Sequence, residues 1–240
     1  MIELKNSASW KSSVDAISSF IAEGNFRFTD SGVKFRALDP SQVVLVNFEM
    51  DKKFFDKYDV EPSFVGLDLV ELSKIMARTQ PNDRLLMELT DSELTLKFEN
   101  ELSRSFSLPI IDVSDEEINL PEPKFEASVE INARMLKEAL KDAGLFGSSV
   151  VLKVKPGQFF IEARGSQGQL KAVSRGSKKV SVSCTSEVTA KYSLNFLQNI
   201  VKEADSEKKV LLELKTDSMI RVSYKIGECP IQFHLAHMIL

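Results

Sequence analysis

The second half of the chain repeats the pattern of the first half at an offset of about 125 residues. Residues 67–96, shifted by that amount, fall within residues 192–222, and the run LLMEL at 85–89 meets VLLEL at 210–214. The coinciding apolar positions are Leu69 with Leu194, Leu72 with Leu197, Ile75 with Ile200, and Met76 with Val201. The repeat predicts two similar domains in one pseudo-symmetric chain, an arrangement that usually serves assembly or an extended ligand.

Composition agrees with two modest globular domains. The 240 residues are 43% hydrophobic and 28% charged, which is enough for two cores of ordinary size. The formal net charge of −4 gives no sign of a nucleic-acid binder, so the positions of the basic residues decide that question. Two cysteines form no disulfide framework, and the first residues show no hydrophobic signal region. We therefore expect an intracellular protein with reduced thiols and no membrane contact.

Four short amphipathic helices are predicted by apolar residues at helical spacing. The first lies within residues 7–22, the second follows Asp68 and the third follows Asn132, two residues that are suitable N-caps. The expected buried positions are Trp10, Val14, Ile17 and Ile21 in the first helix, the two sets matched above in the second and fourth, and Met135, Leu136, Ala139, Leu140 and Ala143 in the third.

Alternating apolar and polar residues predict antiparallel strands between these helices. Three hairpins are expected, at residues 27–37 with an Asp-Ser-Gly turn, at 85–99 with Thr-Asp-Ser, and at 151–163 with Pro-Gly. One face of each sheet would pack against helices, which makes the predicted fold class α+β. We place an N-terminal domain at residues 1–108, a connector at 109–124 and a C-terminal domain at 125–240.

The connector combines three prolines with an acidic run and two apolar residues, Ile118 and Leu120. Prolines fix φ and remove donors, so an extended segment with little claim to a sheet is expected. Composition alone is equally consistent with a solvated linker between domains.

Catalytic signatures are missing from the sequence. It contains no Gly-x-Ser-x-Gly, phosphate-cradling glycine loop or His-Glu-x-x-His pattern, which predicts a protein that is not an enzyme and uses no cofactor. Cys229, His234 and His237, with Cys184, are the one metal-like group, but their spacing matches no paired metal motif. A terminal strand with surface histidines is the better interpretation, and we expect no metal.

Several long strings resemble one family. FTDSGVKFRALDPSQVVLVNF at 28–48, FDKYDVEPSFVGLDLVELSKIMAR at 55–78, RSFSLPIIDVSDEEINLPEPKFEASV at 104–129 and the terminal HLA at 234–236 are similar to the proliferating-cell nuclear antigen (PCNA) sliding clamps of archaeal and eukaryotic replication. The resemblance covers essentially the whole chain, in order, and the connector is closest to archaeal members. It implies a DNA-clamp fold, two domains per subunit and a pseudo-sixfold ring of three subunits around double-stranded DNA.

The resemblance also implies that helices line the central hole and that their basic residues meet phosphates. Contacts of Lys and Arg with phosphate supply affinity without sequence specificity, which a sliding protein needs. Ordinary solvated helix residues are the alternative. The expected DNA-facing residues are Lys11, Lys74, Arg78, Arg134, Lys137, Lys141 and Lys202.

A groove for partner peptides is the second implied site. In the family, a Gln-x-x-aliphatic-x-x-aromatic-aromatic segment docks beneath the connector. Two positions depart from the family pattern, because Met219 and His237 stand where prolines are usual. The matching residues are Leu38, Gln42, Val43, Leu45, Ile118, Leu120, Pro121, Met219, Leu235, Ala236 and His237.

Subunits of the family join edge to edge through strands, here near residues 102–108 and 168–174. The residues expected at this interface are Leu102, Arg104, Phe106, Leu108, Leu170 and Ala172.

Expected partners are a clamp loader and, through peptide motifs, DNA polymerase, flap endonuclease and DNA ligase. The ring is a homotrimer or a heterotrimer with paralogues. Because the groove residues are altered, a specialised or checkpoint-type clamp subunit is the alternative function. An uncharacterised enzyme on a duplicated fold is a third alternative, disfavoured by the missing catalytic constellations. The expected location is cytoplasmic and nucleoid-associated in an archaeon, or nuclear in a eukaryote.

Overall fold

The structure is a computed structural model, and it describes residues 1–114, 118 and 123–239. Contacts divide the chain into two compact units. The first contains Met1–Gln42, Val46–Ile118 and Ile226–Ile231, and the second contains Val43–Leu45, Asn119–Lys225 and Gln232–Leu240. The domain limits expected from the sequence stay a prediction.

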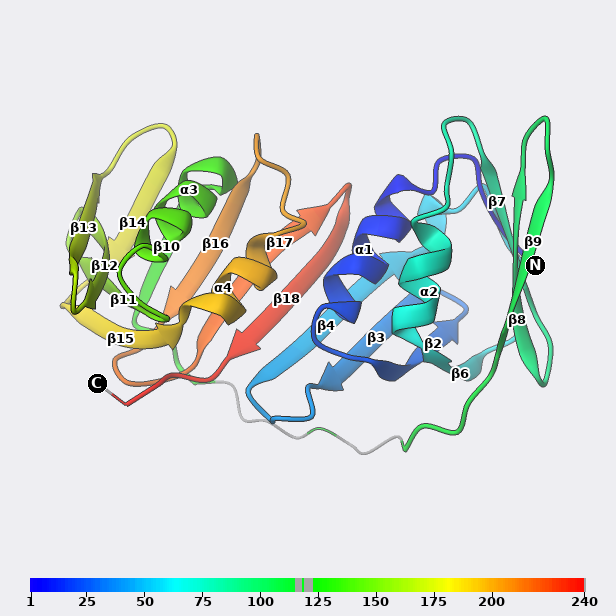
Figure 1. The fold of residues 1–240 in the computed structure, drawn as a ribbon, viewed down its shortest axis with the longest axis horizontal. Coiled ribbons are helices and arrows are strands. Elements are labelled where there is room, and N and C mark those ends of the chain that lie inside the picture. The colour runs from blue at the N-terminus through cyan, green and yellow to red at the C-terminus, as the bar shows by residue number, and fades with distance from the viewer. Residues whose placement is uncertain (115–117, 119–122, 240) are drawn as a thin grey trace. The chain divides into compact units, whose positions relative to one another are not determined.

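The first unit places two helices against antiparallel strands (Figure 1). One sheet has the order β5-β1-β7-β8-β9, and β4, β3, β2 and β6 are neighbours in that order. The elements are β1 (Ile2–Leu4), α1 (Ala8–Ser18), β2 (Glu23–Thr29), β3 (Gly32–Leu38), β4 (Val44–Asp51), the 3-10 turn η1 (Lys52–Phe54), β5 (Lys57–Tyr58), β6 (Ser63–Asp68), α2 (Leu69–Met76), β7 (Arg84–Leu89), β8 (Glu93–Glu99) and β9 (Arg104–Pro109).

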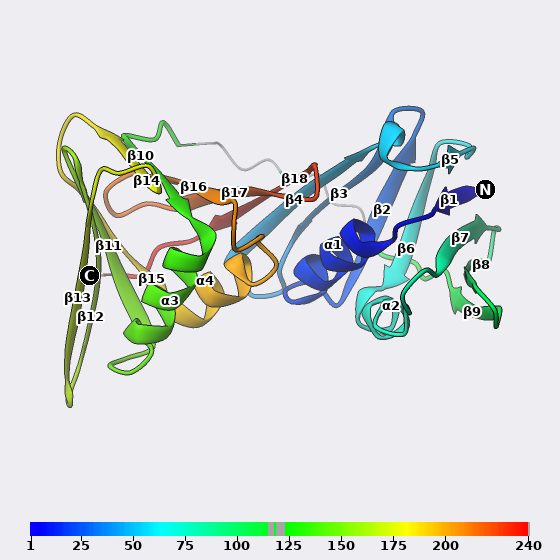
Figure 2. The same ribbon diagram turned by 90° about the horizontal axis from the view of Figure 1, so that it is seen from above.

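The second unit is built in the same way, with α3 and α4 packed side by side on strands (Figure 2). One sheet has the order β13-β12-β11-β15, and β14, β10, β16, β17 and β18 are neighbours in that order. The elements are β10 (Ala127–Asn132), α3 (Ala133–Ala143), β11 (Ser149–Lys155), β12 (Gln158–Gly165), β13 (Gly168–Arg175), β14 (Val180–Cys184), β15 (Val188–Ser193), α4 (Leu194–Val201), β16 (Lys209–Leu214), β17 (Ile220–Ile226) and β18 (Cys229–Leu235).

The duplication predicted from the sequence is present element by element. β6, α2 and β7 have the same bounds as β15, α4 and β16 when 125 is added to each residue number. The order β5-β1-β7-β8-β9 repeats as β14-β10-β16-β17-β18, and β4-β3-β2-β6 repeats as β13-β12-β11-β15. The three expected hairpins are also formed, as β2/β3, β7/β8 and β11/β12. The α+β class is therefore confirmed.

Packing of the apolar helix faces explains why these segments are helical. The Trp10 ring lies 5.4 Å from that of Phe26, which in turn lies 5.0 Å from Phe35, so α1 is anchored on β2 and β3. Asp68 and Asn132 cap α2 and α3 as expected, accepting backbone hydrogen bonds from Glu71 at 2.8 Å and from Met135 at 3.3 Å.

Three details of the sequence interpretation are wrong. The first helix ends at Ser18, not near residue 22, so Ile21 is buried outside the helix. Met135 is 38% exposed, because it lies one residue before the stripe formed by Leu136, Leu140 and Ala143 and therefore about 100° away from it. His234 is only 6% exposed, because the end of β18 is buried on both of its faces and the expected alternation stops there.

The segments that follow β9 and β18 cover strand edges in equivalent ways. The Ile111 amide donates to the Gly66 carbonyl in β6 at 2.9 Å, and the Met238 amide donates to the Lys191 carbonyl in β15 at 2.7 Å. Gly66 and Lys191 are 125 residues apart, so the duplication extends into both tails. A Cβ at Gly66 would lie 2.2 Å from the Ile111 oxygen, so this close approach requires glycine. The first residues of the predicted connector thus bond to strands, which the prolines of the connector did not predict.

We expect Gly32→Ala to lower the free energy of unfolding by more than about 1 kcal/mol. Gly32 has φ +138, and its added Cβ would lie 2.1 Å from the Met50 carbonyl oxygen. Gly176→Ala is the matched control, since no atom lies within 4 Å of its added Cβ. Urea denaturation of both variants checks this, and equal stability of the two would show that the β2/β3 turn tolerates a side chain.

Candidate functional site

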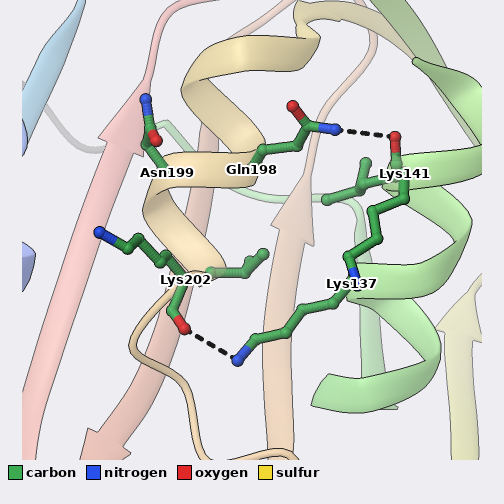
Figure 3. A pocket seen from close by; sticks show the side chains of 7 residues that line it. Lys137, Lys141, Gln198, Asn199 and Lys202 are labelled. Carbon is green, nitrogen blue, oxygen red and sulfur yellow. Dashed lines mark hydrogen bonds between the residues drawn. The ribbon is translucent and has the colours of Figure 1, made fainter.

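In the second unit, α3 and α4 form a basic surface with an apolar floor (Figure 3). A pocket of about 370 Å³ lies between the helices. Leu140 and Val201 form its floor, and the polar residues around it are Lys137, Lys141, Gln198, Asn199 and Lys202. The Gln198 amide donates to the Leu140 carbonyl at 3.0 Å, which fixes the spacing of the two helices.

Lys137 reaches across this pocket and forms hydrogen bonds within its own unit. Its ammonium donates to the carbonyls of Lys202 at 2.8 Å and Ala204 at 2.6 Å, just beyond the end of α4. A cation is favoured there, because the last carbonyls of a helix lack intrahelical donors and carry partial negative charge. Burial lowers the pKa of Lys137, and the carboxylates of Glu203 and Asp205 oppose that shift. Lys137 therefore ties α3 to α4, and two of its three donors are already used.

The other expected basic residues of this unit are more open to solvent. Lys141 pairs with Glu138 on its own helix at 2.7 Å, and Arg134 pairs with Glu207 in the loop before β16. Lys202 is exposed and makes no side-chain hydrogen bond or ion pair with any residue that the structure describes. All three cationic groups lie outside the core and can reach an anion in solvent. Exposed pairs of this kind contribute little to stability and are readily exchanged for another anion.

The first unit presents a smaller basic set on α1 and α2. Lys74 pairs with Glu71 at 2.6 Å, and that hydrogen bond raises the pKa of Lys74. Lys11 and Arg78 have side chains without a partner among the residues described. The helices are joined by a hydrogen bond from the Ser73 hydroxyl to the Asp15 carboxylate at 2.7 Å, not by a lysine.

β9 forms one edge of its sheet and leaves backbone groups available. It pairs with β8, and Ile110 N–H donates to Ser92 at 2.8 Å in continuation of that ladder. Because hydrogen-bonded pairs alternate along antiparallel strands, the register directs the amides of Arg104, Phe106 and Leu108 toward β8. The amides of Ser105 and Ser107 then point away from the sheet.

β13 forms the edge of the four-stranded sheet in the second unit. Gly176 N–H donates to Gly157 at 3.3 Å, and the same alternation directs the amides of Leu170 and Ala172 toward β12. The amides of Lys171 and Val173 point outward. Leu170 and Ala172 are half-buried, as is Phe106 on β9, and Val173 is 48% exposed. Both edges therefore combine outward amides with apolar side chains that are incompletely covered.

Three residues expected at the subunit interface differ in their surroundings. Arg104 is occupied within its own unit, because its guanidinium pairs with the buried Asp83 carboxylate and donates to the Arg78 carbonyl at 2.8 Å. It also lies over the Phe98 ring at 5.4 Å. Leu102, by contrast, is 72% exposed in the loop before β9, and Leu108 is buried.

The expected groove residues lie in both units, and Leu120 and Pro121 are outside the described residues. In the first unit, the Ile118 carbonyl accepts a hydrogen bond from Arg36 at 3.1 Å, Leu38 is half-buried, and Gln42 is exposed with φ +59. In the second unit, the Ala236 amide donates to the Val43 carbonyl at 2.9 Å. Leu45 and Leu235 are fully buried there, and His237 is exposed.

Met219 follows a turn that is held in place by hydrogen bonds, one of them from a buried side chain. The buried Tyr192 hydroxyl donates to the Ser218 carbonyl at 2.9 Å, and burial raises the pKa of that phenol. The Asp217 amide adds a bond to the Thr189 carbonyl at 3.2 Å. Met219 itself is half-buried, so its flexible side chain stands on a rigid support.

Comparison with known proteins identifies the family. The N-terminal domain profile of proliferating cell nuclear antigen matches residues 1–117. A DNA polymerase sliding clamp of Thermococcus gammatolerans is 32% identical over 215 residues, covering 88% of this chain and 86% of the relative. One of Methanococcus vannielii is 30% identical over 238 residues, covering 96% of each chain. The chain belongs to the PCNA family of DNA polymerase sliding clamps.

A solved member of this family has the same fold. The crystal structure of PCNA from Thermococcus kodakaraensis superposes with a TM-score of 0.93 over 99% of both chains, at 22% identity. The expected family and clamp fold are thereby confirmed. Among the residues described, no helix is long and apolar enough to cross a membrane.

We expect Lys137→Met to lower the free energy of unfolding by about 1.5–3 kcal/mol, because it leaves two carbonyls at the end of α4 without their charged donor. Lys141→Met removes an equal charge from the same helix but loses only an exposed ion pair, so its effect should stay within about 0.5 kcal/mol. Chemical denaturation at one protein concentration checks both. Equal losses of unfolding free energy in the two variants would show that Lys137 does not tie α3 to α4.

Proposed function

We propose that this protein is a ring-forming sliding clamp that encircles duplex DNA and holds replication enzymes on it. The ring contains three copies of the chain, and the helices of each unit face the DNA. The protein itself is not an enzyme. The observation that carries the proposal is the pair of open strand edges, β9 in one unit and β13 in the other, each with outward amides and half-covered apolar side chains.

Two different edges on one chain favour a closed ring over an isolated dimer. A heterologous contact joins β9 of one subunit to β13 of the next, and repetition of that contact closes if the rotation permits. Unpaired strand edges otherwise invite aggregation, which natural proteins avoid by pairing or covering them. Pairing would satisfy the outward amides and cover Phe106, Leu170 and Val173.

We assign the DNA contact to the expected basic residues, which differ in whether their side chains already have a partner within the chain. Lys11, Arg78 and Lys202 have no partner among the described residues, and Lys74, Arg134 and Lys141 have exposed carboxylate partners that phosphates can replace. Lys137 acts chiefly as the tie between α3 and α4. Such contacts give salt-sensitive and sequence-independent affinity, which permits sliding.

Proline substitution at outward positions tests the assembly. Ser107→Pro and Lys171→Pro each remove an amide that points away from the sheet, so the pairing within the chain is kept. By light scattering, we expect wild type to have the mass of three chains and each variant to have the mass of one chain. Circular dichroism should show that both variants remain folded.

The matched control is Phe106→Pro, which removes an amide directed at β8 and should also disturb the fold. Variants at residues 107 and 171 that remain trimeric would refute the placement of the interface. A wild type that is monomeric alone, but forms rings when mixed with paralogues, would favour the specialised heterotrimeric subunit.

We further propose that the groove residues bind peptide motifs of DNA polymerase, flap endonuclease and DNA ligase, and that a clamp loader places the ring on DNA. Main-chain pairing of the peptide would supply affinity, and an apolar pocket would receive the aromatic anchor. Met219 provides a flexible wall that can fit several shapes, so partner choice should be relaxed relative to a pocket lined by proline.

A peptide with the pattern Gln-x-x-Leu-x-x-Phe-Phe should bind with a dissociation constant in the micromolar range, about −8 kcal/mol. Val43→Glu and Met219→Glu should each weaken it about tenfold or more, because a carboxylate would enter an apolar contact. These half-buried positions are better tests than Leu45, whose truncation would open the core. Titration calorimetry is the measurement, with a peptide lacking both phenylalanines as control. Absence of heat at high micromolar concentration would exclude this groove.

A further inference from the structure

A second basic site lies in the second unit at the start of α3, apart from the pocket between α3 and α4. It is a pocket of about 190 Å³ without any apolar side chain in its lining. Its residues come from the β13–β14 turn, the beginning of α3, and the segment that leads into β16: Asn132, Arg134, Lys178, Lys179, Glu207 and Lys209. These three segments meet at the same end of the second unit (Figure 1).

The walls of this pocket are held together by backbone hydrogen bonds. The Asn132 amide donates to the Lys179 carbonyl at 2.9 Å, which fixes the β13–β14 turn against the first turn of α3. The Arg134 amide donates to Ser206 at 3.3 Å, which fixes the loop before β16. The turn itself closes through Ser177 and Val180, whose mutual bonds are 2.8 and 3.2 Å long. The lysines at the tip of the turn are therefore presented from a fixed base.

The charges of the lining are unbalanced. Four cations face one carboxylate, Glu207, which already pairs with Arg134. Lys209 lies 3.4 Å from Glu130 on the neighbouring strand. Lys178 and Lys179 are exposed, and neither ammonium has a partner among the residues described. An anion that enters the pocket relieves the repulsion between these like charges, so the lining favours a ligand that carries negative charge.

We propose that this pocket holds a backbone phosphate of duplex DNA, and that Lys178 and Lys179 are DNA-contacting residues. An oxyanion matches a lining that is mostly hydrogen-bond donors and offers no apolar surface to a peptide side chain. Arg134 belongs both to the basic face of α3 and to this pocket, so a duplex that contacts Arg134 lies next to the pocket. This inference rests on the proposed function and extends its DNA contact beyond the helices.

The test compares Lys178→Gln/Lys179→Gln with Lys52→Gln/Lys53→Gln. The second variant also neutralises two adjacent exposed lysines, in η1 of the other unit, so both have the same net charge. Binding of a fluorescent duplex to the full chain is followed by anisotropy over a series of salt concentrations. The slope of log K against log salt should become shallower by roughly 0.9, because the one phosphate held in the pocket is no longer neutralised, and this change should occur in the first variant only.

A second arm separates DNA from free phosphate. Inorganic phosphate, at ionic strength matched with chloride, should raise the melting temperature of wild type and of the 52/53 variant more than that of the 178/179 variant. An unchanged slope in the 178/179 variant overturns the proposal, even where the phosphate effect disappears, because the pocket would then be a site for free anions only. A wild type without salt-dependent duplex binding would instead refute the proposed function, and the proposal with it.

Discussion

Backbone groups at sheet edges are the constraint on which the structure depends. Every strand in the two units offers donors and acceptors on both sides, and burying them without partners is unfavourable. Two of the outer strands, β6 and β15, are covered by the segment that follows the last strand of each half, through Ile111 on Gly66 and Met238 on Lys191. β9 and β13 have no such cover within the described part of their units. The duplication thus creates equivalent edges, and β9 and β13 are the two that the proposed ring would pair.

Much of this architecture could be predicted because local sequence and burial agree. Leu69, Leu72 and Met76 lie on one stripe after a capping aspartate, and the same stripe recurs 125 residues later with identical bounds. The hairpin turns could be predicted equally well, since the Asp-Ser-Gly and Pro-Gly signals restrict the backbone to few conformations. Such features need only neighbours within a few residues, so a single sequence contains them.

The remaining features depend on partners distant in the chain. Lys137 resembles any solvated helix lysine in the sequence, and only the position of the α4 terminus reveals its role. Arg104 was expected at an interface, and the buried Asp83 holds it inside its own unit. The basic pocket at the start of α3 could not be predicted for a similar reason, because Lys178 and Lys179 lie far from Arg134 in sequence. A charge run alone could not distinguish these cases.

The proposed contact with DNA would be weak, because of the way the cationic surface is distributed. Three of the expected helix cations already have carboxylate partners, Glu71, Glu138 and Glu207, so a phosphate must displace an existing pair and gains less than it would from a bare cation. The overall charge of −4 also keeps non-specific attraction to DNA low. A protein that must stay on a duplex by enclosing it needs no strong contact, and strong contacts would slow its movement along the strand. The combination of open sheet edges and partly neutralised lysines therefore suits topological retention better than tight binding.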